Sequence, residues 1–208
     1  MTATESELPS HLRGNGAPVT EELTLTQLEV TGTIPPELDG RYVRNGANPL
    51  TGMSDHPFLG DGMIHGVRLR DGKAEWYRNR YVQTPFIADP DRQVIEVDSS
   101  LRDMTSSKAN THIVGHAGRI LALEEGHFPY VLDGDLNTVG PTDYDGKLTG
   151  PFTAHPKICP STGEMLAFGY YFVEPYLTYL RVSADGQLVQ SEEITVGGPT
   201  MHHDFNIT

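Results

Sequence analysis

The chain has 208 residues, of which 28 are acidic and 15 are lysine or arginine, so its formal net charge is −13. This charge would repel a phosphate backbone and leaves no basic surface, so we expect no nucleic-acid partner. The length allows one large core or two small ones, and the scattered acidic residues indicate a solvated surface.

The cysteine content and the apolar pattern bear on the compartment. The single cysteine, Cys159, has no partner for an internal disulfide, which points to a reducing compartment. The segment 1–16 has no apolar stretch typical of a secretory signal, and no apolar run approaches the ~18 residues that span a bilayer. We therefore expect a cytoplasmic protein.

Residues 1–18 are polar and predict a flexible or surface-draped lead-in. Beyond them, almost every periodic segment alternates apolar and polar residues, which is typical of β-strands. Turn signals such as Asp-Gly separate these segments, and 22 glycines and 15 prolines leave no convincing long amphipathic helix. The sequence thus predicts an all-β protein with strands at residues 23–30, 63–69, 74–82, 112–114, 120–123, 165–172, 176–182 and 188–194.

Short strands joined by tight turns are compatible with a sandwich, a closed barrel or a propeller. A sandwich normally ends within about 100 residues, whereas blade units of ~40 to 50 residues would give about four blades here. No strict repeat is visible, so spacing alone leaves a propeller and a double sandwich open.

Two of the nine histidines lie in settings that suit metal ligands. His155 precedes Pro156, which favours an extended backbone and a fixed side-chain direction, although a loop anchor would need the same. His203, followed by Asp204, ends a short segment opened by two glycines and a proline. Imidazole suits iron, copper or zinc, so the residues alone leave the metal open. His112 and His116 share one side of a predicted strand, but we favour structural roles for them.

Short motifs follow one another along residues 14–208, and they resemble those of the carotenoid cleavage oxygenase family, which includes the retinal pigment epithelium isomerase and the stilbene-cleaving dioxygenases. The resemblance implies the N-terminal part, about three blades, of a seven-bladed β-propeller. Residues 19–208 would form this partial propeller, truncated at the C-terminus. The clearest motifs are Ile34-Pro35-Pro36-Glu37-Leu38-Asp39-Gly40-Arg41-Tyr42-Val43-Arg44-Asn45-Gly46, Gly60-Asp61-Gly62-Met63-Ile64-His65, Phe152-Thr153-Ala154-His155-Pro156-Lys157 and Met201-His202-His203-Asp204-Phe205.

The resemblance also implies a metal site in which four histidines hold Fe(II) without a carboxylate ligand. His155 matches the first of these histidines and His203 the second, and the other two would lie outside this chain. Glu125 matches a family glutamate that accepts a hydrogen bond from a ligand histidine, here expected to be His203, and so fixes its tautomer. We expect His202 to serve in packing or at the edge of a substrate tunnel, and His65 to be structural.

By the same resemblance, the protein would be a non-haem iron dioxygenase. It would use dioxygen to cleave a carbon–carbon double bond of a carotenoid or apocarotenoid, an apolar polyene, into two carbonyl products. A peripheral membrane contact is expected by family analogy alone, and no obligate protein partner is expected. Because it would carry only two of the four iron ligands, the isolated chain should be inactive.

Two alternatives remain at this point. One is an inactive truncated remnant or a binding fragment of the family. The other is a stilbene-cleaving dioxygenase, whose relatives engage the substrate phenol with a tyrosine and a lysine. Tyr81 would match the tyrosine, but Glu124 stands where the lysine is expected, which favours the carotenoid or apocarotenoid reading.

Overall fold

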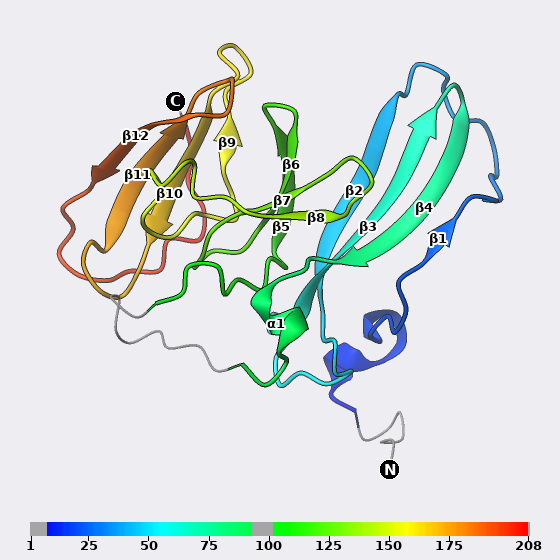
Figure 1. Ribbon diagram of the computed structural model, residues 1–208, viewed down its shortest axis with the longest axis horizontal. Coiled ribbons are helices and arrows are strands. Elements are labelled where there is room, and N and C mark those ends of the chain that lie inside the picture. Colours follow the sequence, from blue (N-terminus) through cyan, green and yellow to red (C-terminus); the bar gives the residue numbers. More distant parts are fainter. Residues whose placement is uncertain (1–7, 93–101, 208) are drawn as a thin grey trace.

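Three sheets of four antiparallel strands make up the part of the chain that the computed structural model describes, residues 8–92 and 102–207 (Figure 1). The all-β prediction is confirmed, and the three sheets match the expected number of blades. Within these residues the α-helix is limited to α1 (Pro85–Ala88). None of the described helices is long and apolar enough to cross a membrane.

The first sheet contains β1 (Thr24–Leu25), β2 (Gly40–Asn48), β3 (Asp61–Arg70) and β4 (Lys73–Tyr81), in the order β1-β4-β3-β2. The turn between β3 and β4 places Asp71 and Gly72 at positive φ, the backbone of a tight hairpin. The long strands β3 and β4 thus pair with each other as a hairpin, and the short β1 pairs with the other edge of β4.

The second and third sheets are meanders, in which each strand pairs with the next strand along the chain. The second sheet contains β5 (His112–His116), β6 (Arg119–Leu123), β7 (Tyr130–Leu132) and β8 (Thr138–Pro141). The third contains β9 (Lys157–Ile158), β10 (Met165–Tyr170), β11 (Leu177–Val182) and β12 (Leu188–Glu193). In Figure 1 the second sheet lies between the other two.

The strand predictions need two corrections. Residues 23–30 contain only the two-residue strand β1. Four strands, β2, β7, β8 and β9, were not predicted. β2 is a run of glycine, arginine and asparagine with few apolar residues, and its nine residues are held by pairing with β3 instead of by an apolar face. β7, β8 and β9 span two to four residues, too few for a period of two to be recognised.

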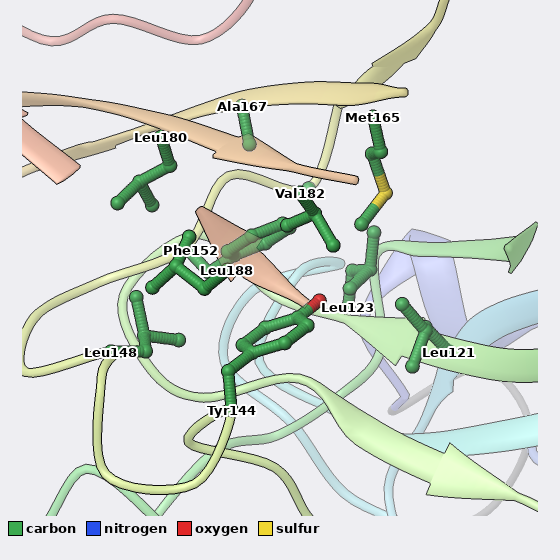
Figure 2. Close-up of a cluster of buried hydrophobic side chains, with 11 residues drawn as sticks. Leu121, Leu123, Tyr144, Leu148, Phe152, Met165, Ala167, Leu180, Val182 and Leu188 are labelled. Atoms are coloured by element: carbon green, nitrogen blue, oxygen red, sulfur yellow. The ribbon is translucent and has the colours of Figure 1, made fainter. Parts of the chain in front are cut away.

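A hydrophobic core joins the second and third sheets. Figure 2 shows Phe152 between Tyr144 and Leu148 of the connecting loop on one side and the side chains of β11 on the other. The rings of Tyr144 and Phe152 stack with centroids 6.1 Å apart. The buried members of this core are Leu121, Leu123, Tyr144, Leu148, Phe152, Ala154, Met165, Ala167, Leu180, Val182 and Leu188.

The first and second sheets meet through both polar and apolar contacts. The amide nitrogen of Asn45, on β2, donates hydrogen bonds to the carbonyl oxygens of Ala109 (2.8 Å) and His112 (3.0 Å). A second buried cluster, which includes Ile64, Val82 and Leu136, fills the space beside these bonds. These two hydrogen bonds tie β2 to the start of β5.

We expect the substitution Phe152→Ala to lower the free energy of unfolding by about 3–5 kcal/mol, because a fully buried ring would leave a cavity between two sheets. Urea denaturation measures this loss. The matched control is Phe58→Ala, since Phe58 is 76% exposed and its removal should change stability by less than about 0.5 kcal/mol. Equal effects of the two substitutions would contradict the packing described here.

Candidate metal centre

His155 is held by the buried segment that precedes it. Thr153 is fully buried; its backbone N–H donates to the carbonyl of Phe168 on β10 (2.8 Å), and its hydroxyl accepts from the N–H of His155 (3.0 Å). The carbonyl of Pro151 approaches Gly169 so closely that no side chain would fit there. This glycine therefore lets the segment before β9 lie against β10, which fixes the backbone of His155.

His203 lies beyond β12, on a segment that returns to the third sheet. Lys157 Nζ and Asp204 Oδ1 form an ion pair of 2.5 Å that ties this segment to β9. The ring of Phe205 packs edge-on against Phe168, with centroids 5.1 Å apart. As a result the imidazole rings of His155 and His203 meet, with centroids 4.5 Å apart and planes at 64°.

Glu125 reaches these histidines from the second sheet, two residues beyond the end of β6. Its Oε1 contacts Nδ1 of His203 and lies 3.8 Å from Nε2 of His155. One donor atom from each of the three residues lies within 4.8 Å of the others. The structure thus brings together all three side chains singled out in the sequence, from two different sheets.

The polar atoms of this cluster fit a bound metal ion. Nε2 of His155 and Oε1 of Glu125 are buried, and neither has a hydrogen-bond partner in residues 8–92 and 102–207. The close approach of Oε1 to His203 is not aligned as a hydrogen bond. Burial, followed by the neighbouring His203, lowers the pKa of His155, which keeps its ring neutral and its lone pair free. Two imidazoles beside a carboxylate suit a divalent transition metal such as Fe(II).

Two further residues support the cluster: Tyr170, which sequence reasoning missed, and His112, for which it favoured a structural role. The hydroxyl of Tyr170, the last residue of β10, donates a 2.5 Å hydrogen bond to Oε2 of Glu125. Burial and the Glu125 carboxylate raise the pKa of Tyr170, so the phenol stays protonated and able to donate. Nδ1 of His112 donates to the carbonyl of Ala154 (2.7 Å), and its ring stacks on His155 at 5.8 Å. No local pattern marks either role, because both contacts cross between sheets.

The other histidines considered from the sequence have separate partners. His116 bonds the carbonyl of Gly163 (3.0 Å), so it does not form a ligand pair with His112. His65 bonds the hydroxyl of Tyr77 across β3 and β4 (2.8 Å), and burial lowers its pKa. His202 bonds the Thr200 hydroxyl (2.8 Å).

The two residues compared with stilbene-cleaving relatives also have structural partners. The Tyr81 hydroxyl accepts a hydrogen bond from Asn48 in the first sheet, and the residue is 8% exposed. Glu124 accepts hydrogen bonds from the His127 ring (2.7 Å) and from the N–H of Gly126 (2.9 Å). These contacts account for both side chains without a substrate phenol.

Comparison with known proteins places this chain in a family. Residues 16–208 match the family model described as retinal pigment epithelial membrane protein. The chain belongs to this family of carotenoid cleavage oxygenases. It is 45% identical to a carotenoid cleavage oxygenase of Mycobacterium tuberculosis over 99% of its length, and 41% identical to carotenoid 9,10(9',10')-cleavage dioxygenase 1 of Arabidopsis thaliana over 98%. It covers 42% and 44% of these relatives, so it spans less than half of their length.

Solved structures of the family have the same fold. The lignostilbene dioxygenase of Pseudomonas brassicacearum superposes with a TM-score of 0.82 and 32% identity, over 97% of this chain and 46% of that one. A variant of the Synechocystis apocarotenoid oxygenase gives a TM-score of 0.77 and 27% identity, over 92% and 46%. The three sheets are therefore blades of the N-terminal part of a β-propeller, which decides between the propeller and the double sandwich.

We expect Tyr170→Phe to weaken metal binding by about tenfold, because Glu125 would lose the hydrogen bond that orients it toward the histidines. Titration of the protein that carries this chain with Co(II), followed by the visible absorption of the bound ion, measures the affinity. Tyr179→Phe, on the neighbouring strand β11, is the matched control and should leave it unchanged. An unchanged affinity in Tyr170→Phe would show that Glu125 needs no such support.

Proposed function

We propose that this chain forms the N-terminal part of a non-haem iron dioxygenase that cleaves a carbon–carbon double bond of a carotenoid or apocarotenoid into two carbonyl products. The observation that carries the proposal is the convergence of Glu125, His155 and His203 within 4.8 Å. The names of the two relatives given above describe carotenoid cleavage, which supports the substrate class. His155 and His203 would be two of four histidine ligands, with the other two supplied from outside this chain.

In this proposal the side chains of the chain orient the site. The negative charge of the Glu125 carboxylate lies against Nδ1 of His203 and would favour a proton on that nitrogen, which would leave the Nε2 lone pair for a metal. Nε2 of His155 is already directed into the cluster. Bound Fe(II) with open coordination positions would supply the activation of dioxygen beside an electron-rich double bond. No side chain needs to act as a general acid or base.

Cleavage of a stilbene is the second candidate, because the lignostilbene dioxygenase superposes well on this chain. Glu124 stands against it, since its carboxylate would repel the phenolate that a lysine would attract. Glu124 stands where the resemblance expects the lysine, and its carboxylate is already bonded to His127. We therefore favour a carotenoid or apocarotenoid over a stilbene as the substrate.

We expect His155→Ala and His203→Ala each to lower both the iron content and the cleavage of an apocarotenal by more than about a hundredfold in the protein that carries this chain, because each removes a ligand. Elemental analysis and product chromatography measure the two quantities. His202→Ala is the neighbouring control and should retain its iron, since its ring bonds Thr200. If both variants retained their iron, His155 and His203 would be excluded as its ligands.

For the 208-residue chain on its own, we expect little bound iron and no cleavage of an apocarotenal, because two histidines do not hold a catalytic ion firmly. Purified chain reconstituted with Fe(II) under anaerobic conditions tests this expectation. Stoichiometric iron with turnover would show that the site is complete within these residues. Activity of the whole protein, with none in the isolated chain, would distinguish an incomplete site from an inactive remnant.

A further inference from the structure

Glu125 lies in the wall of a cavity of about 380 Å³. Arg102, His127, Tyr170 and Tyr171 line the same cavity. A side chain in a cavity wall lacks packing partners on the open side, so its direction depends on the contacts of the chain around it. The position of the Glu125 carboxylate therefore depends on how its own loop and the loop of its partner Tyr170 are held.

The chain that follows Glu125 is held by the segment that precedes β5. Nη2 of Arg102 donates a hydrogen bond to the carbonyl oxygen of Gly126, the residue directly after Glu125. Two residues further on, the N–H of Phe128 donates to the carbonyl oxygen of Met104 (2.9 Å). The two segments therefore lie side by side, and a charged donor fixes the residue next to Glu125.

The same guanidinium also holds the chain next to the partner of Glu125 in the third sheet. Its central carbon lies 3.8 Å from the centre of the Tyr171 ring, in a cation–π contact. Tyr171 directly follows Tyr170, whose hydroxyl donates the 2.5 Å hydrogen bond to Oε2 of Glu125. Arg102 therefore contacts the residue after the donor and the residue after the acceptor of this bond. A planar guanidinium can do both, since it donates in its plane and stacks with its face.

We propose that Arg102 is a positioning residue for the metal centre, which holds the loop after β6 and the loop after β10 at the separation where Tyr170 bonds Glu125. This inference rests on the proposed function, because it requires that His155 and His203 hold a metal ion and that Glu125 orients them. Arg102 does not contact the ion and acts on it only through that one hydrogen bond. The competing role is a general one, in which Arg102 stabilises the fold without a specific effect on Glu125.

A double-mutant cycle on the affinity for Co(II) separates the two roles. It uses the protein that carries this chain, prepared without iron, with Arg102→Met, Tyr170→Phe and the two combined. We expect Arg102→Met alone to weaken Co(II) binding by about fivefold, because the Glu125 carboxylate loses its fixed direction. In the Tyr170→Phe background, where the hydrogen bond is already absent, the same substitution should change the affinity by less than about twofold. Removal of a nearby cation would by itself favour a divalent ion, so a weaker affinity reports positioning.

Arg92→Met is the matched control, because Arg92 bonds Asp103 (2.6 Å) in the same segment and its removal deletes the same charge. It should leave the Co(II) affinity within about twofold of the unsubstituted value. If Arg102→Met does not fold, substitutions of Tyr171 take its place in the cycle. Tyr171→Phe keeps the ring face and should keep the affinity, whereas Tyr171→Leu removes the stacking surface and should weaken binding by about threefold, again only where Tyr170 is present.

Equal losses of affinity in the two backgrounds would overturn the proposal, and so would an affinity that neither Arg102→Met nor Tyr171→Leu changes. A loss in Arg92→Met as large as that in Arg102→Met would assign Arg102 the general structural role. All three outcomes leave the proposed function intact, since the unsubstituted protein still binds the ion. Absence of Co(II) binding by the unsubstituted protein would instead overturn the proposed function, and the inference with it.

Discussion

The site depends on the hydrophobic core between the second and third sheets. Leu123 is buried in that core two residues before Glu125, and Ala154 is buried in it directly before His155. The backbone before Glu125 and the backbone before His155 are therefore fixed by the same core, although the two residues lie next to different sheets. The ion pair of Lys157 with Asp204 is exposed and contributes little stability, but it sets the position of the segment that carries His203.

Glu125 connects the structural and the chemical parts of this arrangement. One of its oxygens accepts the hydrogen bond of Tyr170 from the third sheet, and the other faces His155 and His203. The same carboxylate lines the cavity that contains His127. One side chain therefore faces both histidines and forms part of the cavity wall.

The sequence predicted the parts of the fold that repeat a period of two. β3, β4, β10, β11 and β12 follow that pattern, whereas β2 owes its conformation to pairing with β3 and carries no such pattern. The motifs around His155, His203 and Glu125 identified residues that the structure does bring together. The roles of Tyr170 and His112 could not be predicted, because their contacts depend on how the second and third sheets pack.

The central claim is that His155 and His203 bind one iron ion while Glu125 orients them without binding it. Anomalous diffraction at the iron edge, on crystals of the Fe(II)-loaded protein that carries this chain, tests this claim most directly. The account predicts one iron peak at bonding distance from a ring nitrogen of each histidine, with the Glu125 carboxylate outside the coordination sphere and against the ring of His203. A peak elsewhere, or a peak bonded to Glu125 in place of either histidine, would contradict it.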